Sequence, residues 1–331
     1  MRLNASNARR RALVGVALFG ALLAASCGGG DQVNSFSASR VIALGDETSV
    51  IDDYQGNGNG RKYSVNATVS ETDPTLDCAF NPLWVQSLAT HYGLVFPQCN
   101  KGANPVPSPR SRIRAMNGAR AADLAAQIDA QIAESPIGTG DLVSVLVGEN
   151  DVLAQYATYP STGEPQLIAN VEAAGAEVAR QVNRLADFDA RIVVSTIPDV
   201  GVTPYALAER AAHADIDRAA LLTRMSARFN ASLRATLIND GRRVGLVVFD
   251  ELISVVARYP GLNGFVNTTT GACDLSQSML VPPSILDCTS LTLVDGASGL
   301  SNLWADDRHV SAGAQLSLGT LAVDRAQRNP F

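Results

Sequence analysis

Four short apolar runs, spaced along the chain, constrain the fold more than any other feature of the sequence. Each is rich in Val, Ile or Leu and is followed by Gly, Pro or Asp; the runs are residues 40–44, 142–147, 191–196 and 244–249. Apolar runs of this length are typical of strands buried on both faces, as in a parallel sheet. The sequence therefore predicts a sheet that is covered by helices on both sides.

Helical patterns lie between and around these runs. The predicted helices cover residues 81–92, 119–133, 166–185, 218–239 and 311–325. Strands that alternate with helices predict a doubly wound α/β fold with right-handed crossovers. We expect a single domain over residues 40–331, with long loops at 54–78 and 261–300. Loops of this length are often functional, and in α/β folds they can form a rim around a site at the strand C-termini.

The N-terminus has the pattern of an export signal. Arg2 and three further arginines precede an apolar run over residues 12–25, which is too short to span a bilayer comfortably. Small residues then precede Cys27, which resembles the lipobox of bacterial lipoproteins; a plain signal peptide with an incidental cysteine is the alternative. We expect a signal peptide over 1–26 and a lipidated Cys27 with a flexible tether over 27–39. The exported protein would then be anchored in the bacterial outer membrane, on its periplasmic or cell-surface side.

The charge balance excludes some partners. Residues 1–26 hold four of the 26 basic residues and none of the 32 acidic ones, so the chain without them has a formal net charge of −10. This charge argues against nucleic acid and anionic lipid as partners. Membrane attachment would then depend on acyl chains and not on a basic patch.

Four cysteines follow Cys27, and an even number in an exported protein indicates disulfides. Three pairings are possible; we favour Cys78–Cys99 and Cys273–Cys288, because each closes a local loop. A zinc site is weakly supported, since the chain has no close Cys-x-x-Cys spacing and only three histidines. No Gly-x-Gly-x-x-Gly or Walker loop is present, so we expect no metal and no cofactor.

Candidate catalytic residues stand in the segment LWADDRHVSAGAQ, where Asp306 precedes His309 by three positions. A carboxylate beside an imidazole fixes its tautomer and stabilises its charged form, as a general base requires. Taken alone, the same pattern also fits a surface turn with a loose ion pair.

Two further residues could stabilise an oxyanion. Asn150 follows a buried strand, and its side-chain amide could donate hydrogen bonds there. Gly118 opens a helical stretch, where its backbone N–H could approach a ligand closely. An ordinary turn and a loop glycine are the alternatives for these two positions.

The order of these blocks resembles the SGNH/GDSL hydrolases over nearly the whole chain after the signal. The blocks are Gly45-Asp46, Gly118, Gly148-x-Asn150-Asp151 and Asp306-x-x-His309. The resemblance implies a three-layer, flavodoxin-like sandwich with a mostly parallel central sheet. It also implies an oxyanion hole of Gly118 N–H and the Asn150 side chain, with His309 as base and Asp306 as its orienter. The nucleophilic serine of the family falls at position 47, where this chain has Glu47.

Three interpretations of Glu47 are open. In the first, the site has lost acyl transfer, because a carboxylate repels the charge of a tetrahedral intermediate. In the second, Glu47 is itself a nucleophile or a base that activates water. In the third, the hydroxyl of Thr48 or Ser49 substitutes for the missing serine.

The sequence thus predicts an exported lipoprotein similar to SGNH ester hydrolases. It would act on an acyl or carbohydrate ester, small or polymeric, with an atypical site at Glu47. The alternative is a catalytically silent protein that binds a ligand or an envelope polymer in the same cleft.

Overall fold

Five parallel strands form the central sheet of the computed structural model, which describes residues 36–102, 104–238, 241–328 and 331. Their order is β4-β1-β5-β6-β7, and every neighbouring pair is parallel. The strands are β1 (Arg40–Gly45), β4 (Arg112–Ile113), β5 (Asp141–Leu146), β6 (Arg191–Ser195) and β7 (Val244–Val247). In chain order this is the 2-1-3-4-5 arrangement of flavodoxin-like folds. The predicted α/β fold with a mostly parallel sheet is confirmed.

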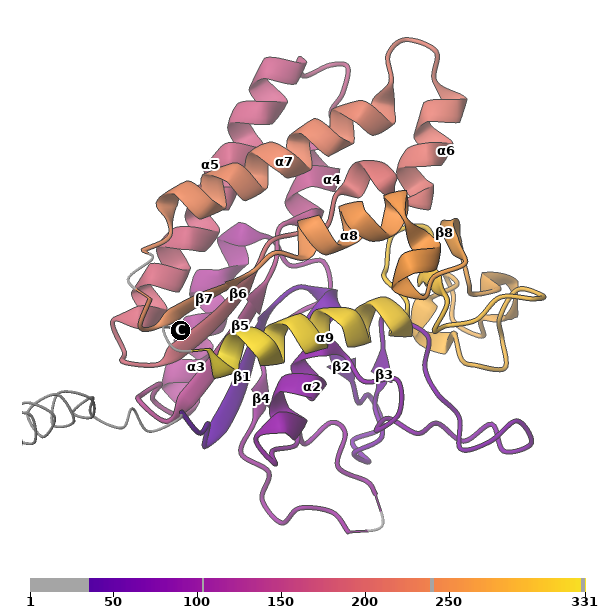
Figure 1. Cartoon of the computed structure of the whole chain (residues 1–331). Helices are drawn as coiled ribbons and strands as arrows, with labels where there is room; N and C mark the ends of the chain where they lie inside the picture. The colour runs from indigo at the N-terminus through magenta and orange to yellow at the C-terminus, as the bar shows by residue number, and fades with distance from the viewer. Residues whose placement is uncertain (1–35, 103, 239–240, 329–330) are drawn as a thin grey trace, which may run out of the picture. The chain divides into compact units, whose positions relative to one another are not determined.

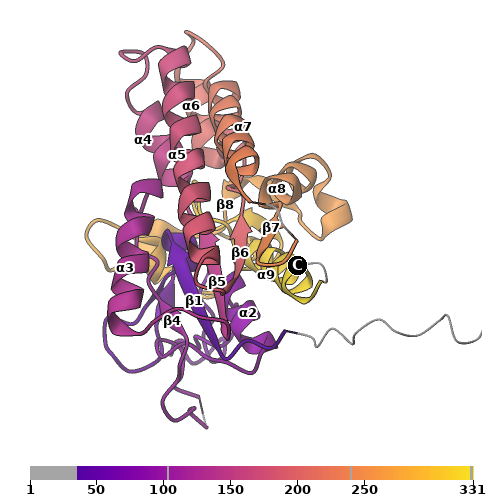
Figure 2. The same cartoon turned by 90° about the vertical axis from the view of Figure 1, so that its left-hand side faces the viewer.

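Helices pack against both faces of this sheet, as Figures 1 and 2 show from two directions. One face carries α3 (Leu124–Glu134), α5 (Glu164–Ala186) and α7 (Arg218–Thr236), which contact one another or the strands beneath them. The other face carries α2 (Trp84–His91) and α9 (Ala312–Gln327), which pack together over β1, β6 and β7. These layers correspond to the five helices predicted from the sequence.

Some elements were not predicted. They are β4 and the helices α4 (Glu149–Tyr156), α6 (Pro204–Ala212) and α8 (Phe249–Arg258). β4 is too short to show a period, and α4 and α8 begin almost directly after the strands β5 and β7. The apolar run predicted as a strand extends to Phe249, whereas this side chain is buried at the first position of α8. A continuous apolar run cannot show where a strand turns into a helix.

The two long loops contain short strands, and each includes at least one disulfide-bonded cysteine. The first loop follows β2 (Ile51–Asp52) and includes β3 (Arg61–Lys62). The strands β2 and β3 pair with each other in antiparallel orientation. The second includes β8 (Asn267–Gly271), which pairs with β9 (Asn302–Trp304). The disulfides join Cys78 to Cys99 and Cys273 to Cys288, the pairing favoured by the sequence.

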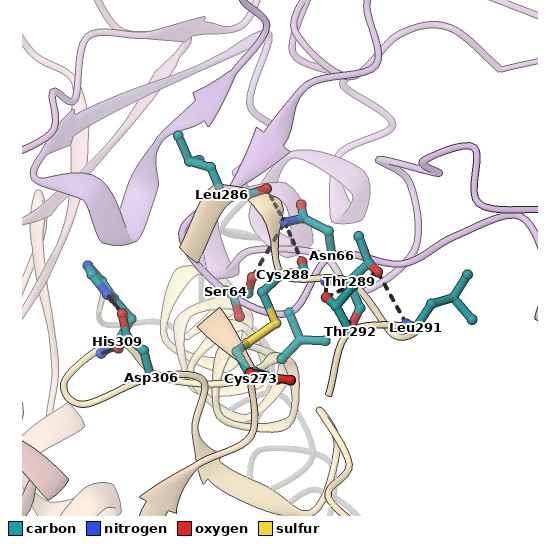
Figure 3. Close-up of a disulfide and its surroundings, with 12 residues drawn as sticks. Ser64, Asn66, Cys273, Leu286, Cys288, Thr289, Leu291, Thr292, Asp306 and His309 are labelled. Atoms are coloured by element: carbon teal, nitrogen blue, oxygen red, sulfur yellow. Dashed lines mark hydrogen bonds and ion pairs between the residues drawn. A yellow bond between two sulfur atoms is a disulfide. The ribbon is translucent and has the colours of Figure 1, made fainter. Parts of the chain in front are cut away.

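Asn66 joins the two loops to each other (Figure 3). Its side-chain amide donates to the carbonyl oxygens of Leu286 at 3.3 Å and Cys288 at 3.0 Å, and its backbone N–H donates to the Cys288 oxygen at 3.0 Å. An ion pair of 2.8 Å between Arg61 and Asp287 adds a second link. The loops therefore brace each other, and Figure 3 shows this junction close to Asp306 and His309.

The predicted signal peptide, residues 1–26, and the predicted lipidation site Cys27 lie outside the described residues, as does most of the predicted tether. Within the part of the chain that the structure describes, no helix combines the length and the apolar character needed to cross a membrane.

We expect Asn66→Ala to lower the free energy of unfolding by about 2–4 kcal/mol, because several buried backbone groups would lose their partner. Asn66 is only 2% exposed. Urea denaturation measures the change, with Asn57→Ala in the same loop as an exposed control. If Asn66→Ala is as stable as this control, the junction does not stabilise the loops.

Candidate active site

Glu47 stands on a tight turn at the end of β1. Gly45 has a φ of 122°, and a Cβ there would lie 1.8 Å from the carbonyl oxygen of Leu146, so only glycine fits. Asp46 then caps a short 3-10 turn over Glu47–Ser49, with its Oδ1 accepting the Thr48 N–H at 3.0 Å. This turn directs Glu47 to the C-terminal edge of the sheet.

The carboxylate of Glu47 lies between the two predicted oxyanion-hole donors. Its Oε2 accepts the backbone N–H of Gly118 and the side-chain amide of Asn150, each at 2.9 Å. Gly118 has a φ of 72°, a conformation that favours glycine and turns its N–H toward Glu47. Asn150 follows the strand β5 and lies in the first turn of α4. The Glu47 carboxylate thus accepts from both donors that were predicted to form an oxyanion hole.

His309 and Asp306 form the predicted pair. His309 Nδ1 and Asp306 Oδ2 are 2.6 Å apart, and Asp306 Oδ1 accepts the backbone N–H of His309 at 2.6 Å. The other ring nitrogen, Nε2, lies 3.6 Å from Glu47 Oε1. His309 therefore connects two carboxylates, and its ring packs near Tyr63, with 5.8 Å between the ring centroids.

Arg308 completes the surroundings of Glu47. Its Nη1 donates to Asn150 Oδ1 at 3.3 Å, and its Nη2 lies 3.7 Å from Glu47 Oε1. Because the Asn150 oxygen faces this guanidinium, its NH₂ group must face Glu47. Arg308 therefore orients the Asn150 amide and adds a second positive charge beside Glu47.

The ionisation of Glu47 and His309 follows from these contacts. Burial alone would raise the pKa of Glu47, but its contact with His309 and the Gly118 N–H lower it to about 2. Burial alone would lower the pKa of His309, but the two carboxylates of Asp306 and Glu47 raise it to about 10. At neutral pH the site thus holds an ionised Glu47 and a protonated His309.

Two carboxyl groups next to Glu47 have raised pKa values, in contrast to the lowered pKa of Glu47. Burial raises the pKa of Asp46 well above its ordinary value, and repulsion from Glu47 and Glu149 adds to this. Burial also raises the pKa of Glu149 to about 7, against the lowering effect of His309 and Arg308. The ionised Glu47 carboxylate thus disfavours a second negative charge beside it.

Neither alternative hydroxyl is joined to His309. Ser49 is fully buried, and its Oγ accepts a hydrogen bond from Trp84 Nε1 at 3.0 Å. Thr48 lies beside Glu47, where its backbone N–H is bound to Asp46. The cavity above these residues has a volume of only about 10 Å³, the space of one water molecule.

The sequence motifs did not predict a role for Arg308, Glu149 or Tyr63. Arg308 and Glu149 stand inside the two motifs that supplied the other site residues, and a charged side chain there was an available signal. Tyr63 comes from a long loop and had no such signal. Among the described residues, no group of three or more His, Cys, Asp or Glu side chains could hold a metal ion.

The family follows from the sequence profile that matches this chain. The profile is that of the GDSL-like lipase/acylhydrolases, and it covers residues 41–319. The chain belongs to this family. No curated protein sequence matches the chain.

Several solved structures are similar to this family member. Axe2, an acetylxylan esterase from Geobacillus stearothermophilus, is 12% identical, with 89% of this chain and 97% of that chain covered and a TM-score of 0.43. A lipase/acylhydrolase from Enterococcus faecalis is 13% identical, with 87% and 95% covered and a TM-score of 0.38. LAE5, an α/β hydrolase from the metagenome of Lake Arreo, Spain, is 15% identical, with 88% and 96% covered and a TM-score of 0.43. Similarities of this degree carry no conclusion about the substrate.

We expect His309 to remain protonated at pH 8. The substitution Glu47→Gln should lower the pKa of His309, because one of the two negative charges beside the ring is lost. Imidazole ¹H–¹⁵N spectra recorded against pH measure both effects, with Glu164→Gln as a distant control. Because the pKa of His309 is raised, the contacts of its charged ring with Asp306 and Glu47 stabilise the fold fully below about pH 6.5. This stabilisation is lost as the pH rises through about 10. A wild-type His309 that titrates near 6.5 would contradict this charge arrangement.

Proposed function

We propose that this chain is an exported, lipid-anchored hydrolase of acyl or carbohydrate esters in which Glu47 fills the oxyanion hole between turnovers. The observation that carries the proposal is the pair of 2.9 Å hydrogen bonds from Gly118 and Asn150 to Glu47 Oε2. An ester carbonyl needs the same two donors when its oxygen becomes negative. Glu47 therefore competes with the substrate for them.

Glu47 itself is a poor nucleophile or base in this position. Two hydrogen bonds and the nearby charges of His309 and Arg308 stabilise its carboxylate. The contacts with His309 and with the Gly118 N–H lower its pKa to about 2, far from the near-neutral value that suits a general base. We therefore assign Glu47 the role of a plug and not that of a reacting group.

The strength of this plug sets the expected rate. The contacts with His309 and the Gly118 N–H favour the ionised carboxylate and lower its pKa. A substrate must displace this carboxylate from both donors, which lowers its apparent affinity or rate. Slow hydrolysis is therefore expected, with Asp306 and His309 still in use.

The closed cavity also favours a second candidate, a catalytically silent protein that binds an ester-bearing ligand or an envelope polymer. A volume of about 10 Å³ leaves no room for an ester while Glu47 is in place. The two candidates differ in whether wild type hydrolyses any ester faster than buffer does.

We expect Glu47→Ser to hydrolyse short-chain p-nitrophenyl esters at least about 100-fold faster than wild type. The change empties the oxyanion hole and places a hydroxyl near His309. Stopped-flow absorbance measures the rate, and a burst of p-nitrophenol would indicate an acyl-enzyme in the variant. Wild type should be slow and without a burst.

Glu47→Gln and His309→Ala are the matched controls. Glu47→Gln keeps a side chain in the hole and should show no gain, whereas His309→Ala should abolish the activity of both wild type and Glu47→Ser. A fast wild type that is inactivated by Glu47→Gln would mean that Glu47 is a catalytic group. A wild type no faster than buffer would favour the silent candidate.

The anchor is tested separately. The small residues before Cys27 and the glycines after it support lipidation. In a Gram-negative host, metabolic labelling with an alkyne fatty acid should mark wild type, whereas Cys27→Ala should remain unlabelled and leave the membrane fraction. Equal labelling of both proteins would exclude Cys27 as the anchor.

A further inference from the structure

The cavity beside Glu47 is lined by several charged groups and has the size of one water molecule. Its volume is about 10 Å³, and Asp46, Glu149, Arg308 and His309 line it together with Glu47. Glu149 stands at the first position of α4, next to the oxyanion donor Asn150. The proposed function gives no role to Glu149 or to Asp46.

Two buried polar atoms at this cavity lack a hydrogen-bond partner among the described residues, although His309 Nε2 also forms an ion pair of 3.6 Å with Glu47 Oε1. Within the described part of the chain, no residue hydrogen-bonds the buried atoms Asp46 Oδ2 and His309 Nε2. None donates to the Glu149 carboxyl either. Asp46 is 1% exposed and the His309 side chain 10% exposed, so bulk water does not solvate them fully. A buried water typically makes two to four hydrogen bonds to groups of this kind.

We propose that this cavity binds the attacking water of ester hydrolysis, with Asp46 and His309 holding the water and Glu149 accepting its proton. The proposal rests on the proposed function and adds a catalytic residue to it. The cavity adjoins the Glu47 carboxylate, so a carbonyl that replaces Glu47 in the oxyanion hole would meet this water.

The reaction then proceeds by addition of water to the ester carbonyl and loss of the alcohol, without an acyl-enzyme. The water oxygen forms a bond to the acyl carbon while its proton passes to the Glu149 carboxylate, and the carbonyl electron pair moves to the oxygen held by Gly118 and Asn150. The C–O ester bond next breaks, and the protonated Nε2 of His309 gives its proton to the leaving alkoxide. The products are the acid and the alcohol, and one proton returns from Glu149 to His309 through solvent.

The charges around Glu149 suit it to accept a proton from water, whereas those around His309 do not. Glu47, Asp46 and Asp306 disfavour its charge, whereas Arg308 and His309 favour it, and burial brings its pKa to about 7. A base with that pKa is present in both forms at neutral pH. His309, already protonated between two carboxylates, can act as the acid but not as the first base.

The test is the pH dependence of kcat/KM for ethyl acetate, whose alkoxide leaving group needs the proton of His309, in wild type, Glu149→Gln and Glu149→Asp. Wild type should rise through about pH 7 as Glu149 ionises and fall as His309 loses its proton near pH 10. Glu149→Gln should lower kcat at least about 100-fold with little change in KM, and the rise near pH 7 should disappear. Glu149→Asp, which keeps a carboxylate, should restore part of the rate and part of the rise.

Glu164→Gln is the matched control, because Glu164 is also an acid at the first position of a helix, and its partly exposed side chain on α5 pairs with Arg224 instead. Unchanged kcat and an unchanged rise near pH 7 in Glu149→Gln would overturn the assignment of Glu149 while leaving the proposed function intact. A wild type with no His309-dependent hydrolysis would overturn both. Circular dichroism shows whether Glu149→Gln folds. If it does not fold, Glu149→Asp decides: a wild-type rate with a shift in the pH at which kcat/KM rises supports the assignment. The same variant with an unshifted rise overturns it.

Discussion

The rest of the site depends on one carboxylate, that of Glu47, which accepts hydrogen bonds from Gly118 and Asn150. Together with the larger effect of Asp306, its charge keeps His309 protonated. A second ionised carboxyl nearby would meet repulsion, which contributes to the raised pKa of Asp46. Glu47 thus helps to determine the charge state of the side chains around it.

The fold brings these groups together from distant parts of the sequence. Glu47 follows β1, Gly118 lies between β4 and α3, and Asn150 follows β5, so three neighbouring strands contribute at their C-terminal ends. Asp306 and His309 come from the segment between β9 and α9, beside the junction made by Asn66 (Figure 3). This is the edge of a parallel sheet at which ligands of α/β proteins bind.

Much of the fold was predictable because it depends on local patterns. The apolar runs that became β1, β5, β6 and β7 are recognisable without tertiary information, whereas β4 has only two residues and owes its place to its pairing with β1. The order of the site motifs likewise indicated which residues would meet. The position of the Glu47 carboxylate and the contact between Arg308 and Asn150 depend on side-chain geometry across 103 and 158 positions of sequence, which no local pattern encodes.

The central claim is that Glu47 occupies the oxyanion hole, and acetate binding tests it most directly. Acetate titrated into Glu47→Ala should bind where the Glu47 carboxylate was, and the ¹H–¹⁵N signal of Gly118 should shift in a saturable manner. Wild type should show no such shift, because its own carboxylate already holds both donors. Equal shifts in wild type and variant, or none in Glu47→Ala, would contradict the account.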